Sequence, residues 1–182
     1  MKHRIFIAIN LPEKIKKELA SFQKKFKKLD VRWAKEENLH LTLAFIGGID
    51  EPKIETIKEI LKKVVLDFPP FLLRLTKIAL GPDSKRPRMI WVGGEARGDL
   101  IKLVEQLREA LTQEKIFVDQ KHSFKIHLTL ARARGKELFG RKIYEEIDLV
   151  FPVNEIAIME SKLEKEGAEY KRLEIYSLRS RN

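Results

Sequence analysis

The sequence contains no cysteine, and this excludes disulfide bonds, thiolate nucleophiles and cysteine-ligated zinc. It also lacks an apolar run near the roughly 20 residues that a membrane-spanning helix needs. The N-terminal segment does not show the basic, apolar and small-residue order of a signal peptide. We therefore expect a cytoplasmic protein that does not bind a membrane.

Acidic residues are too few to balance the basic ones. The chain carries 37 Lys and Arg against 27 Asp and Glu, a formal net charge of +10. Such an excess favours a polyanionic partner such as RNA, although many soluble proteins are equally basic. The sequence has no Gly-x-x-x-x-Gly-Lys-Ser/Thr motif, so no P-loop nucleotide site is indicated.

Apolar periodicity predicts strands interleaved with amphipathic helices. Strands are expected over 4–9, 31–34, 39–45, 71–80, 88–93, 124–131, 153–163 and 169–178. The first three helices are expected over about 12–29, 51–66 and 100–111, and a weaker fourth over 136–146. Gly47-Gly48 is expected to end the third strand, and 164–167 to connect the last two strands as a hairpin. The predicted fold class is α+β with mostly antiparallel sheets, in one domain spanning 1–182 and made of two intertwined lobes.

One short motif occurs twice, as His40-Leu41-Thr42-Leu43 and as His127-Leu128-Thr129-Leu130. On a strand, residues i and i+2 share a face, so each histidine lies beside its threonine while the leucines point into the core. If the two halves are related by a pseudo-two-fold axis, both His-Thr pairs face one cleft. His3 and His122 have no such counterpart, and we expect structural roles for them.

Two histidines and two threonines in one cleft suit phosphodiester chemistry. One imidazole can remove a proton from the attacking oxygen while the other protonates the leaving oxygen. The hydroxyl groups can donate hydrogen bonds to non-bridging phosphate oxygens. This chemistry needs no metal and no cofactor, and the sequence has neither a His-x-His nor a His-Glu-x-x-His motif.

The residues that follow the two copies differ. Phe45 follows the first, where it could stack on a base, and Arg132 follows the second, where it could bind phosphate. Strict alternation puts both on the face opposite the histidines. Either the strands end or bulge before these positions, or both residues are structural. Arg32 and Trp33, just before the first copy, could also line the cleft, although Trp33 is expected in the core.

The chain resembles the 2H phosphoesterases, which are named for two His-x-Thr motifs on a bilobal fold with two pseudo-symmetric antiparallel sheets, flanking helices and a central cleft. Within them it looks most like the RNA 2′,3′-cyclic phosphodiesterases, formerly called 2′-5′ RNA ligases. The resemblance covers nearly the whole chain, through both motifs and through Ile5-Phe6-Ile7-Ala8-Ile9, Val31-Arg32-Trp33, Glu37-Asn38-Leu39, Phe45-Ile46-Gly47, Ala131-Arg132, Ser161-Lys162-Leu163 and Gly167-Ala168-Glu169-Tyr170.

The resemblance implies hydrolysis of the 2′,3′-cyclic phosphate at an RNA 3′ end to a 2′-phosphomonoester. It implies His40 as proton donor and His127 as proton acceptor, although the residues themselves fit either order. Thr42, Thr129, Arg132 and Phe45 would bind the substrate. Three alternatives remain open: a 2′,5′ RNA ligase that uses the same site, a module that binds RNA ends without turnover, and an enzyme acting on a small cyclic nucleotide. The net charge of +10 favours a longer polyanion over the last of these. We expect a monomer.

Overall fold

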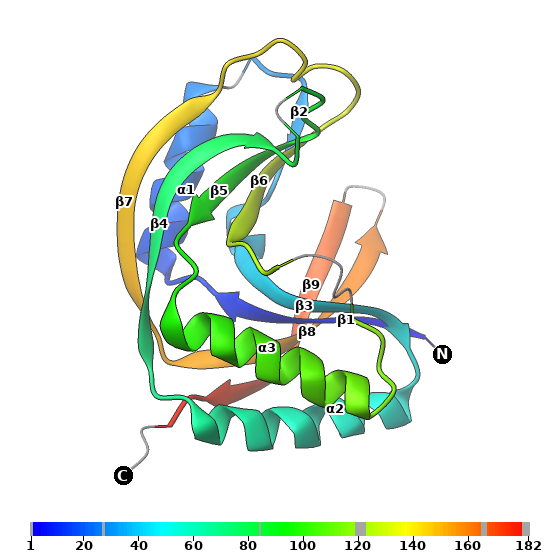
Figure 1. Ribbon diagram of the computed structural model, residues 1–182. Helices are drawn as coiled ribbons and strands as arrows, with labels where there is room; N and C mark the ends of the chain where they lie inside the picture. The colour runs from blue at the N-terminus through cyan, green and yellow to red at the C-terminus, as the bar shows by residue number, and fades with distance from the viewer. Residues whose placement is uncertain (1, 27, 84, 119–122, 165–166, 180–182) are drawn as a thin grey trace.

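The computed structural model describes residues 2–26, 28–83, 85–118, 123–164 and 167–179. Its strands form two antiparallel sheets that stand at an angle to each other (Figure 1). The four-stranded sheet has the order β3 (His40–Ile49), β1 (His3–Asn10), β8 (Glu155–Glu164) and β9 (Gly167–Ser177). The five-stranded sheet has the order β2 (Val31–Trp33), β6 (His127–Ala133), β5 (Met89–Gly94), β4 (Phe71–Gly81) and β7 (Tyr144–Val153).

The two sheets are built from interwoven segments of the chain. Strand β2 lies between β1 and β3 in the sequence but belongs to the five-stranded sheet. Strands β8 and β9 return at the end of the chain to the four-stranded sheet. Most of the buried apolar residues form one cluster that includes side chains from both sheets. Neither sheet is therefore the product of one continuous half of the sequence.

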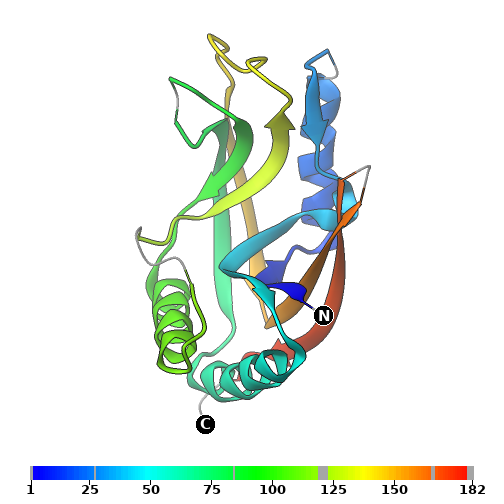
Figure 2. The same cartoon turned by 90° about the vertical axis from the view of Figure 1, so that its right-hand side faces the viewer.

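Three α-helices flank the sheets, and each buries an apolar stripe at helical spacing. Helix α1 (Glu13–Lys25) lies behind the five-stranded sheet, where Lys25 pairs with Glu145 of β7 at 2.6 Å (Figure 1). Helices α2 (Glu51–Val64) and α3 (Gly98–Gln113) lie side by side at the other end of the molecule (Figure 2). Short 3-10 turns occur at η1 (Glu36–Asn38) and η2 (Val65–Asp67). None of the described helices is long and apolar enough to cross a membrane.

The structure corrects two expectations about local structure. The helix predicted over 136–146 is absent, and the chain there turns and then enters β7 at Tyr144. This strand alternates inward Ile147, Leu149 and Phe151 with exposed neighbours, a period of two that decides the local structure. Gly47-Gly48 does not end β3, which continues to Ile49 because Gly47 adopts φ +84°, a conformation that glycine tolerates.

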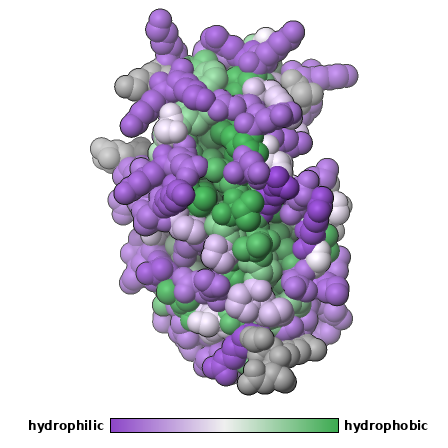
Figure 3. Space-filling model, turned by 90° about the vertical axis from the view of Figure 1, so that its left-hand side faces the viewer, coloured by the Kyte–Doolittle hydropathy of each residue, from purple (hydrophilic) through white to green (hydrophobic). Residues whose placement is uncertain are grey.

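The predicted final hairpin is confirmed in β8 and β9, and its tip, 165–166, lies outside the described residues. The side of the molecule that carries the edge strand β7 is shown in Figure 3, where an apolar strip runs between hydrophilic side chains. Exposed apolar residues on β4 and β7 include Leu72, Tyr144 and Val150.

Candidate active site

The two copies of the duplicated motif lie on neighbouring strands of different sheets. β3 is the edge strand of the four-stranded sheet, and it contacts β6 of the five-stranded sheet. The four motif leucines are buried, with at most 1% of each exposed to solvent. His40, Thr42 and Thr129 are half-buried and His127 is exposed. The predicted alternation of leucines inward and His-Thr pairs outward is confirmed.

A β-bulge follows each His-x-Thr pair at the same position. In β3, Thr42 pairs with Ala8 and Ala44 with Ile7, so Leu43 is an extra residue. In β6, Thr129 pairs with Trp91 and Ala131 with Ile90, and Leu130 is the extra residue. In each copy the leucine and the alanine after it are both buried.

Each bulge changes which face the next side chain takes. After the bulges, Phe45 is 50% exposed and Arg132 is exposed. Both residues line the same cavity as the histidines. The sequence allowed the strands to end, to bulge, or to carry Phe45 and Arg132 on the face opposite the histidines. The structure shows that the strands bulge.

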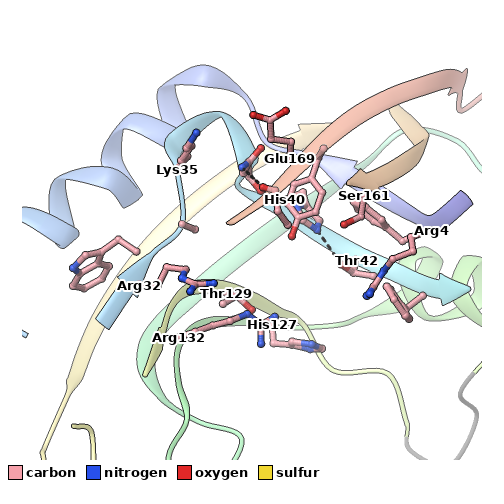
Figure 4. Close-up of a pocket in the computed structure, with 17 residues that line it drawn as sticks. Arg4, Arg32, Lys35, His40, Thr42, His127, Thr129, Arg132, Ser161 and Glu169 are labelled. Atoms are coloured by element: carbon pink, nitrogen blue, oxygen red, sulfur yellow. Dashed lines mark hydrogen bonds between the residues drawn. The ribbon is translucent and has the colours of Figure 1, made fainter. Parts of the chain in front are cut away.

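This cavity has a volume of about 920 Å³ and lies between the two sheets (Figure 4). All six residues singled out in the sequence line it: His40, Thr42, Phe45, His127, Thr129 and Arg132. Trp33 also lines it while packing against the core. The structure therefore brings the whole predicted set together.

His40 is held by hydrogen bonds on both ring nitrogens. Its Nδ1 lies 2.7 Å from the Asn38 carbonyl oxygen, and its Nε2 lies 3.1 Å from Thr42 Oγ1. A carbonyl oxygen only accepts hydrogen bonds, so Nδ1 carries the hydrogen and Nε2 is the atom directed at Thr42 and the cavity. The ring packs on Phe6, with centroids 4.9 Å apart, and against the edge of Tyr170 at 5.0 Å.

Burial lowers the pKa of His40 below the ordinary histidine value, and the nearby Lys16 ammonium lowers this pKa further. The hydrogen bond to the Asn38 carbonyl opposes these effects without cancelling them. The free protein therefore holds His40 as a neutral imidazole near neutral pH.

His127 has the same backbone contact in a more open setting. Its Nδ1 lies 2.9 Å from the Lys125 carbonyl oxygen, which again leaves Nε2 for the cavity. Its ring packs on the Trp91 indole, with centroids 4.7 Å apart and planes 37° apart. The two histidines thus share a tautomer and differ in exposure.

Arg132 extends from β6 beyond the second His-Thr pair. Its Nη1 donates to Met89 Sδ at 3.3 Å, and Thr129 Oγ1 lies 3.9 Å from the same sulfur. Arg132 has no ion pair with any described carboxylate. The basic residues Lys85, Arg86 and Arg88 do not line the cavity.

Several cavity residues were not predicted from the sequence. Arg4 and Phe6 share the cavity face of β1, and their alternation with Ile5 and Ile7 could have revealed them. Tyr170 reaches His40 from β9, and only the register of the last hairpin shows this. Ser161, Lys35 and Glu169 complete the additions that Figure 4 labels.

His3 is the other histidine that the structure describes, and it does not line the cavity. His3 Nδ1 forms a 2.6 Å hydrogen bond with Glu160 Oε1 on the neighbouring strand β8. His122 lies outside the described residues. In the described part of the chain, no three or more His, Asp or Glu side chains gather as a metal site would require.

Sequence comparisons connect this geometry to known proteins. A family model described as LigT like phosphoesterase matches residues 9–91. A Thermotoga maritima protein named RNA 2′,3′-cyclic phosphodiesterase is 36% identical over 162 residues, which cover 88% of this chain and 84% of that protein. A Methanocaldococcus jannaschii protein of the same name is 32% identical over 173 residues, 92% of this chain and 96% of the relative.

Solved structures show the same fold over the full length. A Thermus thermophilus protein superimposes with a TM-score of 0.89 at 29% identity, covering 98% of this chain and all of that one. E. coli LigT, in a crystal structure with 3′-AMP, gives a TM-score of 0.84 at 25% identity and covers 99% of this chain. The chain therefore belongs to the LigT-like phosphoesterases, a family of the 2H phosphoesterases.

Proposed function

We propose that this enzyme hydrolyses 2′,3′-cyclic phosphate ends of RNA to 2′-phosphomonoesters. The observation that carries the proposal is the pair of His-Thr units on bulged strands that line one cavity. The names of the relatives support the substrate class, because they are called RNA 2′,3′-cyclic phosphodiesterases. The net charge of +10 suits a polyanion.

In the proposed reaction, His127 acts as the general base and His40 as the general acid. His127 Nε2 takes a proton from water, and the water oxygen bonds to phosphorus. The bond from phosphorus to the 3′ oxygen breaks, and His40 Nε2 donates a proton to that oxygen. Thr42 and Thr129 donate hydrogen bonds to the non-bridging oxygens, where charge increases in the transition state.

The contrast in burial supports this assignment. His127 is exposed, so water can approach its Nε2. His40 is neutral in the free protein, and the anionic substrate supplies the negative charge that stabilises its protonated form. A buried imidazolium is a strong acid, because losing the proton also removes the cost of burying a charge.

Phe45 and Arg132 would hold the substrate at opposite ends of the cavity, because Phe45 packs beside Arg4, which lies at the end away from Arg132 (Figure 4). The ring of Phe45 is half exposed and carries the Arg4 guanidinium 5.6 Å from its centroid. A base could stack on this ring. At the other end, Arg132 offers a planar guanidinium without a carboxylate partner among the described residues.

The direct test is incubation with an RNA oligonucleotide that ends in a 2′,3′-cyclic phosphate, in buffer containing EDTA. We expect conversion to the 2′-phosphate, and identifying the product isomer would show which phosphorus-oxygen bond breaks. Unchanged substrate at substantial enzyme concentration would contradict the proposal. Tight, salt-sensitive binding without a product would indicate a module that only holds RNA ends. Adding an RNA with a free 5′ hydroxyl tests for 2′,5′ joining.

A further inference from the structure

Two arginines face each other directly at one end of the cavity. In the register of β2 and β6, Arg32 is the partner of Arg132. Directly opposed residues share a face of the sheet, and both of these line the cavity and are exposed. Figure 4 shows the two side chains at the same end, on the side of Thr129 away from Arg4, and Lys35 also lines the cavity.

This pairing of like charges is unfavourable in the free protein. Among the described residues, no carboxylate forms an ion pair with Arg32, Arg132 or Lys35. An acidic residue is nearby, but Asp30 pairs with Arg134, 3.5 Å away, which does not line the cavity. Among the described residues that line the cavity, only Glu169 carries a carboxylate, and it lies on the far side of His40 from the two arginines (Figure 4). An anionic ligand would relieve the repulsion.

The position of Arg32 fits a phosphate other than the one that reacts. The reacting phosphate belongs between the two His-Thr pairs, on β3 and β6. Arg32 lies one strand farther out, on β2, at the cavity end away from Arg4 (Figure 4). The terminal ribose of an RNA carries three groups: the base, the 2′,3′-cyclic phosphate and, at its 5′ oxygen, the phosphodiester that leads to the rest of the chain. If the base lies toward Phe45, the 5′ phosphodiester can extend toward Arg32.

We propose that Arg32, together with Arg132, binds the phosphodiester that connects the terminal nucleotide to its 5′ neighbour. The inference rests on the proposed function for the placement of the cyclic phosphate. Arg132 lies between the two phosphates, and its five donors allow contact with both. Arg32 contacts only the second. This site lets the enzyme distinguish an RNA end from a small cyclic nucleotide.

The first test compares two ligands that differ by one phosphate. Calorimetry should show that the wild-type protein binds adenosine 3′,5′-bisphosphate more tightly than 3′-AMP. Arg32→Gln should weaken binding of the bisphosphate by about tenfold, the lower end for a charged hydrogen bond, and leave 3′-AMP binding unchanged. Arg97→Gln removes the same charge from a residue outside the cavity and should change neither affinity. Arg32→Lys should recover part of the loss.

A second test uses turnover of a dinucleotide that ends in a 2′,3′-cyclic phosphate. Replacing its internal phosphodiester by a neutral methylphosphonate should lower kcat/KM of the wild-type enzyme by about the same tenfold as Arg32→Gln. In the Arg32→Gln enzyme this replacement should have no further effect, because the interaction is already lost.

Equal binding of the two ligands by the wild type would overturn the inference. So would an equal loss for both ligands in Arg32→Gln, because Arg32 would then act on the single phosphate or on folding. A thermal melt of each variant separates these causes. If the wild-type enzyme turns over no cyclic phosphate but still prefers the bisphosphate through Arg32, the proposed function fails and the anion site stands.

Discussion

Strands β3 and β6 present the same five residues on the same bulged backbone, yet they surround their histidines differently. His40 packs between Phe6 and Tyr170 and bonds to Thr42, whereas His127 packs on Trp91 and is exposed. Phe45 follows one bulge and Arg132 the other. The duplicated backbone sets the geometry of the reacting groups, and the neighbouring strands set their chemistry. In the proposed mechanism, the duplicated strand therefore provides one position for the acid and an equivalent position for the base.

Removing either histidine should have the largest effect. We expect His40→Ala and His127→Ala each to lower kcat/KM on a cyclic-phosphate RNA by about 10²- to 10⁴-fold, because each removes one proton-transfer group. The double variant should lose less than the product of the single losses, since the two groups act in one step. His3→Ala is the control, and it should retain activity if it stays folded. Full activity in either single variant would refute the paired mechanism.

The threonines test whether the two copies bind phosphate alike. Thr42→Ala and Thr129→Ala should each cost roughly 10²- to 10³-fold in kcat, the scale for losing one hydrogen-bond donor to a developing anion. Serine keeps the hydroxyl, so Thr→Ser at either position should restore most of the rate. Thr42 also bonds to His40 Nε2, and its loss should therefore change the pH profile where loss of Thr129 does not. Identical profiles for both variants would argue against this difference.

Phe45 tests the asymmetry after the bulges. Phe45→Ala should weaken binding by roughly 1 to 3 kcal/mol, the usual value of one aromatic stack on a base, and should raise KM more than it lowers kcat. Phe117→Ala is a matched control, because Phe117 is 79% exposed and does not line the cavity. An unchanged KM in Phe45→Ala would contradict the proposed stacking of Phe45 on a base.

The smallest effect concerns the protonation of His40 in the free enzyme. Histidine NMR should place its pKa below the ordinary value, and Lys16→Met should raise this pKa by removing a nearby positive charge. Inorganic phosphate should raise it as well. When pH falls below about 6.5, the ordinary histidine value, the unfolded chain protonates first at this position. His40 should therefore make the fold less stable toward acid, and His40→Gln should reduce that loss. A pKa of His40 at or above the ordinary value would contradict its assigned burial.

The sequence predicted the parts of the site that depend on local pattern. Alternation alone assigned the faces of the His-Thr pairs and the buried leucines. The sequence could not decide whether the strands bulge after the His-Thr pairs. A bulge is an extra residue relative to the neighbouring strand, so it can be recognised only from the pairing with β1 and β5. The burial of His40 depends on Phe6 and Tyr170, which arrive from other strands. Strand β7 was not predicted, although its apolar residues alternate with a clear period of two. The prediction of a weak helix over 136–146 overlooked this local pattern.

The paired assignment of acid and base has a direct chemical test. Sulfur in place of the 3′ bridging oxygen makes a leaving group that needs no general acid, since a thiolate is far more stable than an alkoxide. On this substrate, His40→Ala should regain a rate close to that of the wild type, while His127→Ala stays impaired because water still needs a base. Rescue of His127→Ala instead would reverse the two roles, and rescue of neither would contradict acid-base catalysis by this pair.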